Sequence, residues 1–190
     1  MRLAAVVAVA AAPQWALAAS ASYVVTGNCR DGQPHGAYEL RMLDGTMRVA
    51  GAFTRGKRTG TFLFWSSSGT RIALLPYDDD VLSGTVALWY SAAGPKVEPR
   101  SKLEAVYANG RVAGSTRSWY PDGRPRTEFR YDGGVLAEAR AWSATGAPMP
   151  EAEARALAAR DLREDEQYFS TLEANVRDNP PRCDANGRKP

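Results

Sequence analysis

The sequence predicts a mainly β fold, an elongated antiparallel sheet of about five stacked β-hairpins with a C-terminal α-helix packed back on it. Two observations carry this prediction. Sixteen of the 17 glycines lie between Gly27 and Gly146, where they recur with a period of 24 residues. The stretch 150–178 has no glycine and instead carries one apolar stripe at helical spacing. The chain therefore divides into a signal segment (1–18), a repeat domain (19–149), a helix (150–178) and a tail (179–190).

The first 18 residues have the composition of a secretory signal peptide. A basic residue is followed by an apolar stretch, and Ala16 and Ala18 are the small residues typical before a cleavage site. About ten strongly apolar residues precede Pro13, whereas a membrane span needs roughly 20. We therefore expect cleavage after Ala18 and a periplasmic or secreted protein that does not span a membrane.

The middle of the chain is a tandem repeat. Residues 27–36 and 51–60 align over a shift of 24 residues with three coincident glycines, and the period continues to Gly84. The next unit opens thirty residues later, at Gly114, so it contains six extra residues. We place this insertion at residues 95–102, where two prolines interrupt the strand pattern.

Each repeat unit predicts one β-hairpin. Segments of five to eight residues between the glycines, such as 61–65 and 85–90, are rich in aromatic and β-branched residues. Asp-Gly, Asn-Gly and Ser-Gly pairs bound them, and glycine accepts the positive φ that tight turns require. With a degenerate last copy from Glu138, about five hairpins would stack into one long twisted sheet.

The unit from Gly114 to Gly134 shows the repeat pattern most clearly. It has an opening glycine, the aromatic pair Trp119 and Tyr120, a polar turn with a glycine, a second strand ending in an aromatic residue, and a closing glycine. This pattern resembles the MORN repeat in its bacterial variant form, over roughly residues 27–146. The resemblance implies a non-catalytic binding or scaffolding module with a protein or membrane-lipid partner. It is specific for a fold and unspecific for a function.

Residues 150–178 predict an amphipathic helix. Pro150 and the acidic residues behind it suit a helix start, and the prolines after Asn179 stop it. At 1.5 Å per residue the helix is roughly 43 Å long, close to the roughly 48 Å width of ten strands. It can therefore run back along the sheet and bring Cys183 toward Cys29. Two cysteines in an exported protein usually pair, so we expect a disulfide between them; the alternative is two unrelated thiols.

A ladder of aromatic residues is the first candidate site. Trp65, Trp89 and Trp119 share one position in successive units and would form a row down one face of the sheet. Such a row can stack on sugars or hold an apolar partner, but more often it is simply covered, here by the C-terminal helix. The apolar residues that alternate with the row point to the opposite face, so one helix cannot cover both faces. These opposite-face residues are Tyr38, Leu40, Phe62, Phe64, Val86 and Leu88.

Charge adds a second candidate. The 24 basic and 21 acidic residues give a formal net charge of +3, and the predicted helix alone carries eight acidic and four basic residues. The repeat domain is therefore about +4, with arginines clustered late, which would favour anionic lipid or polysaccharide and is too diffuse for nucleic acid. The candidate binding residues are Trp65, Trp89, Trp119, Tyr90, Tyr120, Arg117, Arg126 and Arg130.

The sequence supplies few groups for catalysis. One histidine, His35, and two cysteines poorly supply a zinc site or a histidine-dependent triad. The acidic run 78–80 lacks the spaced ligands of a calcium loop, and no phosphate loop or nucleophile elbow occurs. We therefore expect a non-enzymatic protein without cofactor or metal that binds a protein partner. The alternative is an envelope-associated binder of anionic lipid or glycan through the arginines and aromatic residues.

Overall fold

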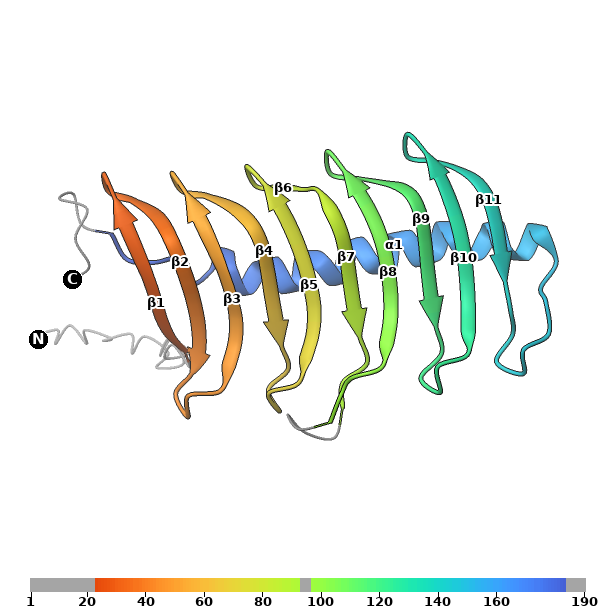
Figure 1. Ribbon diagram of the computed structural model, residues 1–190, viewed down its shortest axis with the longest axis horizontal. Helices are drawn as coiled ribbons and strands as arrows, with labels where there is room; N and C mark the ends of the chain where they lie inside the picture. Colours follow the sequence, from red (N-terminus) through yellow and green to blue (C-terminus); the bar gives the residue numbers. More distant parts are fainter. Residues whose placement is uncertain (1–22, 93–96, 184–190) are drawn as a thin grey trace, which may run out of the picture.

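The computed structural model describes residues 23–92 and 97–183 (Figure 1). In these ranges 11 antiparallel strands form one open sheet, and a single C-terminal helix packs on it, as the repeats predicted. The predicted signal peptide and most of the predicted tail lie outside the described residues. The elements are β1 (Tyr23–Arg30), β2 (Gln33–Met42), β3 (Met47–Thr54), β4 (Lys57–Trp65), β5 (Arg71–Asp78), β6 (Val81–Leu82), β7 (Gly84–Trp89), β8 (Ser101–Ala108), β9 (Arg111–Trp119), β10 (Pro125–Asp132), β11 (Val135–Ala141) and α1 (Glu151–Arg177).

The strands pair in the order in which they occur along the chain. The path runs from β1 to β11, with the two-residue β6 paired to β5 outside it. This is the order that stacked hairpins produce, because each hairpin pairs with the next one. The predicted insertion, 95–102, falls between β7 and β8 except for its last two residues, which belong to β8 because that strand starts at Ser101.

At one end of the strands, a row of tight turns joins them in pairs (top of Figure 1). Both central residues of each turn have positive φ, as in the type I′ turns whose twist matches that of the flanking strands. Neighbouring turns are also bonded: the Gly56 N–H donates to the Pro34 carbonyl and the Gly110 N–H to the Leu82 carbonyl, both at 2.9 Å. The five turns are centred on Asp31-Gly32, Arg55-Gly56, Asp79-Asp80, Asn109-Gly110 and Gly133-Gly134.

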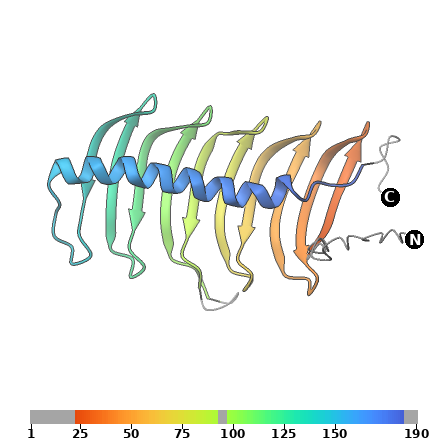
Figure 2. The same cartoon turned by 180° about the vertical axis from the view of Figure 1, so that it is seen from behind.

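The core lies between one face of the sheet and α1, which crosses the strands along the length of the sheet (Figure 2). A row of directly paired residues, one from each of the ten strands of the path, runs along this face and is called here the core row. Strand alternation sends every second side chain to this face, and α1 excludes water from it. The core row consists of Val25, Leu40, Val49, Phe64, Ala73, Leu88, Leu103, Ser118, Thr127 and Ala141.

The helix α1 begins and ends one residue inside the predicted bounds. It buries an apolar stripe against the sheet, and its end is tied to the first hairpins, where the Tyr38 hydroxyl donates to the Asn179 carbonyl at 2.8 Å. The predicted disulfide is present, with 5.7 Å between the Cα atoms of Cys29 and Cys183. Within the described ranges, no helix has the length and apolar character needed to span a membrane. The buried helix residues are Ala154, Leu157, Ala158, Phe169, Leu172 and Val176.

Gly51 in β3 allows the Phe62 ring to lie directly against the backbone. A Cβ atom at Gly51 would lie 2.6 Å from the Phe62 Cδ1 and Cε1 atoms. The Phe62 ring is fully buried and makes edge-on contacts with Phe53 and Tyr77 at centroid distances of 5.6 and 5.5 Å. It therefore has little room to move aside.

We expect Gly51→Ala to lower the free energy of unfolding by about 2 kcal/mol, because the added methyl group overpacks the core. Urea titration followed by circular dichroism measures this change. In a Phe62→Leu background the same substitution should cost less, since the shorter side chain leaves space for the methyl group. Equal costs in the two backgrounds would show that the close contact with Phe62 is not the cause.

Candidate functional site

The sheet face opposite α1 carries a second row of directly paired residues, called here the open-face row. Figure 1 looks onto this face, with the helix behind the sheet. The row is apolar in the middle of the sheet and charged toward β11. It consists of Thr26, Glu39, Ala50, Leu63, Leu74, Ala87, Glu104, Arg117, Glu128 and Arg140.

The charged end of the open-face row alternates in sign from strand to strand. Glu104, Arg117, Glu128 and Arg140 are successive cross-strand neighbours. The Glu128 carboxylate lies 3.9 Å from the Arg117 guanidinium and 3.6 Å from that of Arg140. These pairs are exposed and add little stability. Their main consequence is a patterned surface with no excess of one sign.

The tryptophan ladder lies on the open face, so the prediction that α1 covers it is wrong. Phe64 and Leu88 are fully buried beneath the helix, and strand alternation places their neighbours Trp65 and Trp89 on the other side. Trp119 follows the buried Ser118 in the same way. All three tryptophans are half-buried. The apolar residues that the sequence placed on the face opposite the tryptophans are the ones that α1 covers. Each of the first three units contributes two of them, so they form a broader apolar strip than the tryptophans do.

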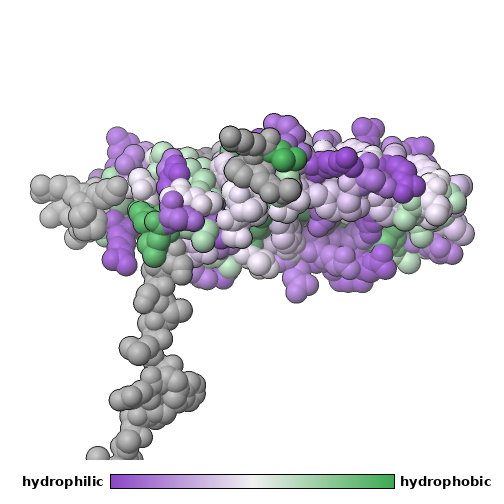
Figure 3. Space-filling model, turned by 90° about the horizontal axis from the view of Figure 1, so that it is seen from below, coloured by the Kyte–Doolittle hydropathy of each residue, from purple (hydrophilic) through white to green (hydrophobic). Residues whose placement is uncertain are grey.

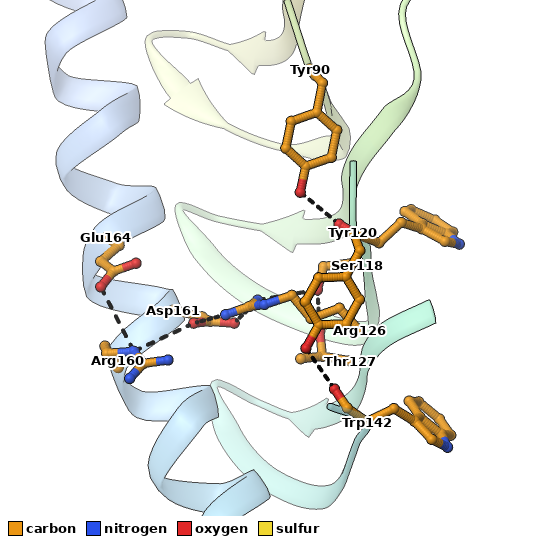
Figure 4. A network of polar contacts seen from close by, with 10 residues as sticks. Tyr90, Ser118, Tyr120, Arg126, Thr127, Trp142, Arg160, Asp161 and Glu164 are labelled. Carbon is orange, nitrogen blue, oxygen red and sulfur yellow. Dashed lines mark hydrogen bonds and ion pairs between the residues drawn. The ribbon is translucent and has the colours of Figure 1, made fainter. Parts of the chain in front are cut away.

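Trp142 is a fourth member of the ladder, which the sequence analysis missed. The Tyr90 hydroxyl donates to the Trp119 carbonyl and the Tyr120 hydroxyl to the Trp142 carbonyl, each at 2.8 Å, so Trp119 and Trp142 are equivalent. The Trp142 ring points away from α1 (Figure 4). Counting from the opening position failed because Trp142 follows Glu138 by four residues, whereas the other tryptophans follow their opening glycine by five. Counting back four residues from the turn glycine, as for Trp65, finds it.

Tyr90 and Tyr120 do not join the tryptophans on the open face. Their rings lie on the side of the strands that faces the helix (Figure 4). Burial raises the pKa of the Tyr90 hydroxyl. Because each hydroxyl bonds to a main-chain carbonyl of the next unit, these tyrosines connect neighbouring hairpins.

The three candidate arginines are also divided between the faces. Arg117 and Arg130 are exposed, and Arg130 bonds to Glu138 at 2.8 Å. Arg126 instead points toward α1, where its guanidinium forms a two-pronged ion pair with Asp161 (Figure 4). Its side chain is 25 % exposed and that of Asp161 only 13 %. The bond to Asp161 raises the pKa of Arg126. The eight candidate residues therefore do not form one binding face.

A β-bulge causes the unexpected direction of Arg126. Pro125 pairs with Trp119 and Thr127 with Ser118, so Arg126 is an extra residue in β10. Such a residue breaks the alternation and re-aims its side chain. Lys102 is the extra residue of the preceding bulge, and it too faces the helix, with its ammonium 5.3 Å from the centre of the Tyr168 ring.

The side of the sheet where the strands end in the turns after the tryptophans (bottom of Figure 1) is mostly polar. Viewed from this side, hydrophilic residues dominate and hydrophobic ones form small separate patches (Figure 3). Arg71 lies over the Trp89 ring at 4.4 Å, a cation–π contact. The acidic run is at the other end of the strands, in the row of tight turns, where Asp79 pairs with Lys57 and Asp80 with Arg58. Among residues 23–92 and 97–183, no three His, Cys, Asp or Glu side chains are grouped to hold a metal ion.

Comparisons with known proteins do not assign the chain to a family. A scan against protein-family profiles finds no match, and a search of curated proteins finds none either. The arrangement of the site itself therefore has to carry any functional conclusion.

Proposed function

We propose that this chain is a non-enzymatic, MORN-like repeat protein that is exported to the periplasm or secreted, and that it binds a protein partner through the open face of its sheet. One observation carries the proposal: the open-face row combines a half-buried apolar centre with a charged end of alternating sign. The disulfide between Cys29 and Cys183 is consistent with an oxidising, extracytoplasmic location. That location supports the proposed signal peptide.

The pattern of charge favours a protein over the alternative of an anionic lipid or glycan. A lipid headgroup layer presents one sign of charge and attracts an unbalanced basic patch. Here Arg117, Arg126 and Arg130 each have a carboxylate partner within 4 Å. A row that alternates in sign is instead complementary to another side-chain surface that alternates in the opposite register. The half-buried Leu63 and Leu74 supply the apolar centre that protein interfaces require.

The direct test replaces the apolar centre of the open-face row. Wild type, a Leu63→Glu, Leu74→Glu variant and the control Ser170→Glu, an exposed helix residue, would each capture proteins from an envelope extract. We expect a protein captured by wild type and by the control to be lost at least tenfold with the open-face variant. Circular dichroism verifies that all three are folded.

Identical recovery by all three proteins would contradict the proposal. Sedimentation with anionic vesicles and with peptidoglycan examines the alternative function. We expect weak binding that is equal for anionic and neutral vesicles. Strong salt-sensitive binding to anionic vesicles that an Arg117→Gln, Arg130→Gln variant loses would instead favour the lipid alternative.

A further inference from the structure

A cavity of about 290 Å³ lies between α1 and strands β8, β9 and β10. It is on the helix side of the sheet, away from the open face. Its walls are mixed: Leu103, Val112 and Phe129 from the sheet and Leu162 from the helix alternate with hydroxyl-bearing and charged side chains. A volume near 300 Å³ lies at the lower end of the range of small-molecule sites, which combine apolar walls with placed polar groups.

The cavity exists because the repeat replaces large core residues with small polar ones at this place. The third position of each unit holds Tyr38, Phe62 and Val86 in the first three units, but Thr116 in the fourth. The core row changes at the same point: it is apolar at every position except Ser118 and Thr127, which bond to each other. The volume that aromatic rings fill elsewhere is therefore left open.

Several polar groups around the cavity have no protein partner. The Thr116 hydroxyl oxygen is buried in a residue that is 8 % exposed, and no described residue bonds to it. Tyr107 and Tyr131 line the same cavity, and neither hydroxyl forms a hydrogen bond among the described residues. By contrast, the Tyr38 and Tyr77 hydroxyls are bonded, to the Asn179 carbonyl and to Glu173. A buried hydroxyl without a partner is costly in a core, so the Thr116 hydroxyl points to a ligand that pairs with it.

Asp165 contributes a carboxylate to this cavity. The side chain is half-buried, and it forms no hydrogen bond or ion pair among the described residues. The charged groups that face it are Lys102 and Arg126 from the sheet and Asp161 and Glu164 from the helix. Arg126 is already held by Asp161, and the Lys102 ammonium lies over the Tyr168 ring. Asp165 is thus a carboxylate without a direct ion-pair partner among the described residues.

We propose that this cavity binds a small organic ammonium ion, with Asp165 as its counter-ion. A primary ammonium carries three N–H donors, and the cavity residues offer acceptors for them: the Asp165 carboxylate and the hydroxyl oxygens of Thr116, Tyr107 and Tyr131. The tyrosine rings favour a cation as well. An anion would meet the Asp165 carboxylate, and a neutral molecule would leave that carboxylate without an ion pair.

The affinity for an ammonium ion should depend on pH. Burial, with a smaller contribution from the nearby Asp161 charge, raises the pKa of Asp165 to about 7. The ammonium ion binds the ionised carboxylate, so its affinity should rise as the pH increases through 7. Between pH 6 and pH 8 the ionised fraction increases about tenfold, and the affinity should increase by a similar factor.

The experiment uses three probes of the same shape: 2-phenylethylammonium, 2-phenylethanol and phenylacetate, which are cationic, neutral and anionic. Protein-observed NMR titrations of the oxidised protein at pH 8 measure each dissociation constant. We expect the ammonium probe to bind at least tenfold more tightly than the alcohol, and to shift the resonances of Tyr107 and Thr116. Equal affinities of the three probes, or no binding of the ammonium probe, would overturn the proposal.

Asp165→Asn should reduce the affinity for the ammonium probe at least tenfold, leave the alcohol unaffected, and abolish the pH dependence. Glu153→Gln, an exposed change of the same charge on the same helix, is the matched control and should change nothing. Thr116→Val removes one acceptor at constant shape and should weaken binding severalfold. Unchanged affinity in both cavity variants would also overturn the proposal, whatever the result for the open face.

Discussion

Replacing the disulfide by a Cys29→Ser, Cys183→Ser pair is expected to lower the free energy of unfolding by about 5 kcal/mol. The bond joins residues 154 positions apart. In the chain-entropy description, closing a loop of that length removes about 5 kcal/mol of freedom from the unfolded chain. Urea titrations of the oxidised wild type and of the double-serine variant measure the difference.

Removal of the disulfide should loosen α1 most at the end that lies over the first hairpins. There the segment after the helix packs on β1: a Cβ at Gly27 would lie 2.7 Å from Pro181. Without the bond, hydrogen exchange should accelerate more at Leu172–Arg177 than at Ala154–Ala158, because the far end of the helix remains attached by its short connection to β11. A loss below 1 kcal/mol, or uniform exchange along α1, would contradict this role. Alkylation without reduction should find no free thiol.

Arg126→Leu is the second substitution for which we expect a large loss, about 3 kcal/mol. It leaves the largely buried Asp161 carboxylate close to Asp165, with only the exposed Arg160 guanidinium, 4.0 Å away, as a counter-ion. Breaking a buried pair from one side is costly. Thermal and urea unfolding at pH 7 measure the effect. Arg130→Leu, on the same strand but in an exposed pair with Glu138, is the control and should cost less than 1 kcal/mol.

A second comparison separates the unpaired charge from lost packing. In an Arg126→Leu, Asp161→Leu variant no charge is left alone, so most of the stability should return. If the double variant is as unstable as Arg126→Leu, then the aliphatic part of the arginine, and not its charge, stabilises the contact with α1. If Arg126→Leu and Arg130→Leu cost the same, the ion pair with Asp161 has no special role.

The division of the candidate binding residues between the two faces of the sheet matters for the proposed function. Each arginine that suggested an anionic partner has its own carboxylate partner. The partner of Arg126 comes from the helix, and those of Arg117 and Arg130 come from the sheet. The tryptophans remain together, with Trp142 added, along the margin of the open face. A binding partner would therefore meet an apolar centre and alternating charges rather than a basic patch. This is why protein capture is the first experiment for the open face.

Much of the architecture could be predicted from the sequence because its signals are local or periodic. The hairpins follow from glycines spaced by 24 residues and from turn pairs such as Asn109-Gly110. The helix follows from its apolar stripe, and the disulfide from the match between helix length and sheet width. Each of these depends on spacing along the chain, which the sequence states directly.

The tertiary structure alone decided which face is core and where individual side chains point. Both faces of the predicted sheet carry apolar residues, so the choice depends on which strip fits α1 more completely. A bulge of one residue reverses the direction of Arg126, and nothing in the spacing of the repeats announces it. The cavity arises only when Thr116 of the sheet and Asp165 of the helix are brought together. Side-chain direction depends on pairing between strands and packing between layers, which alternation within a single strand does not specify.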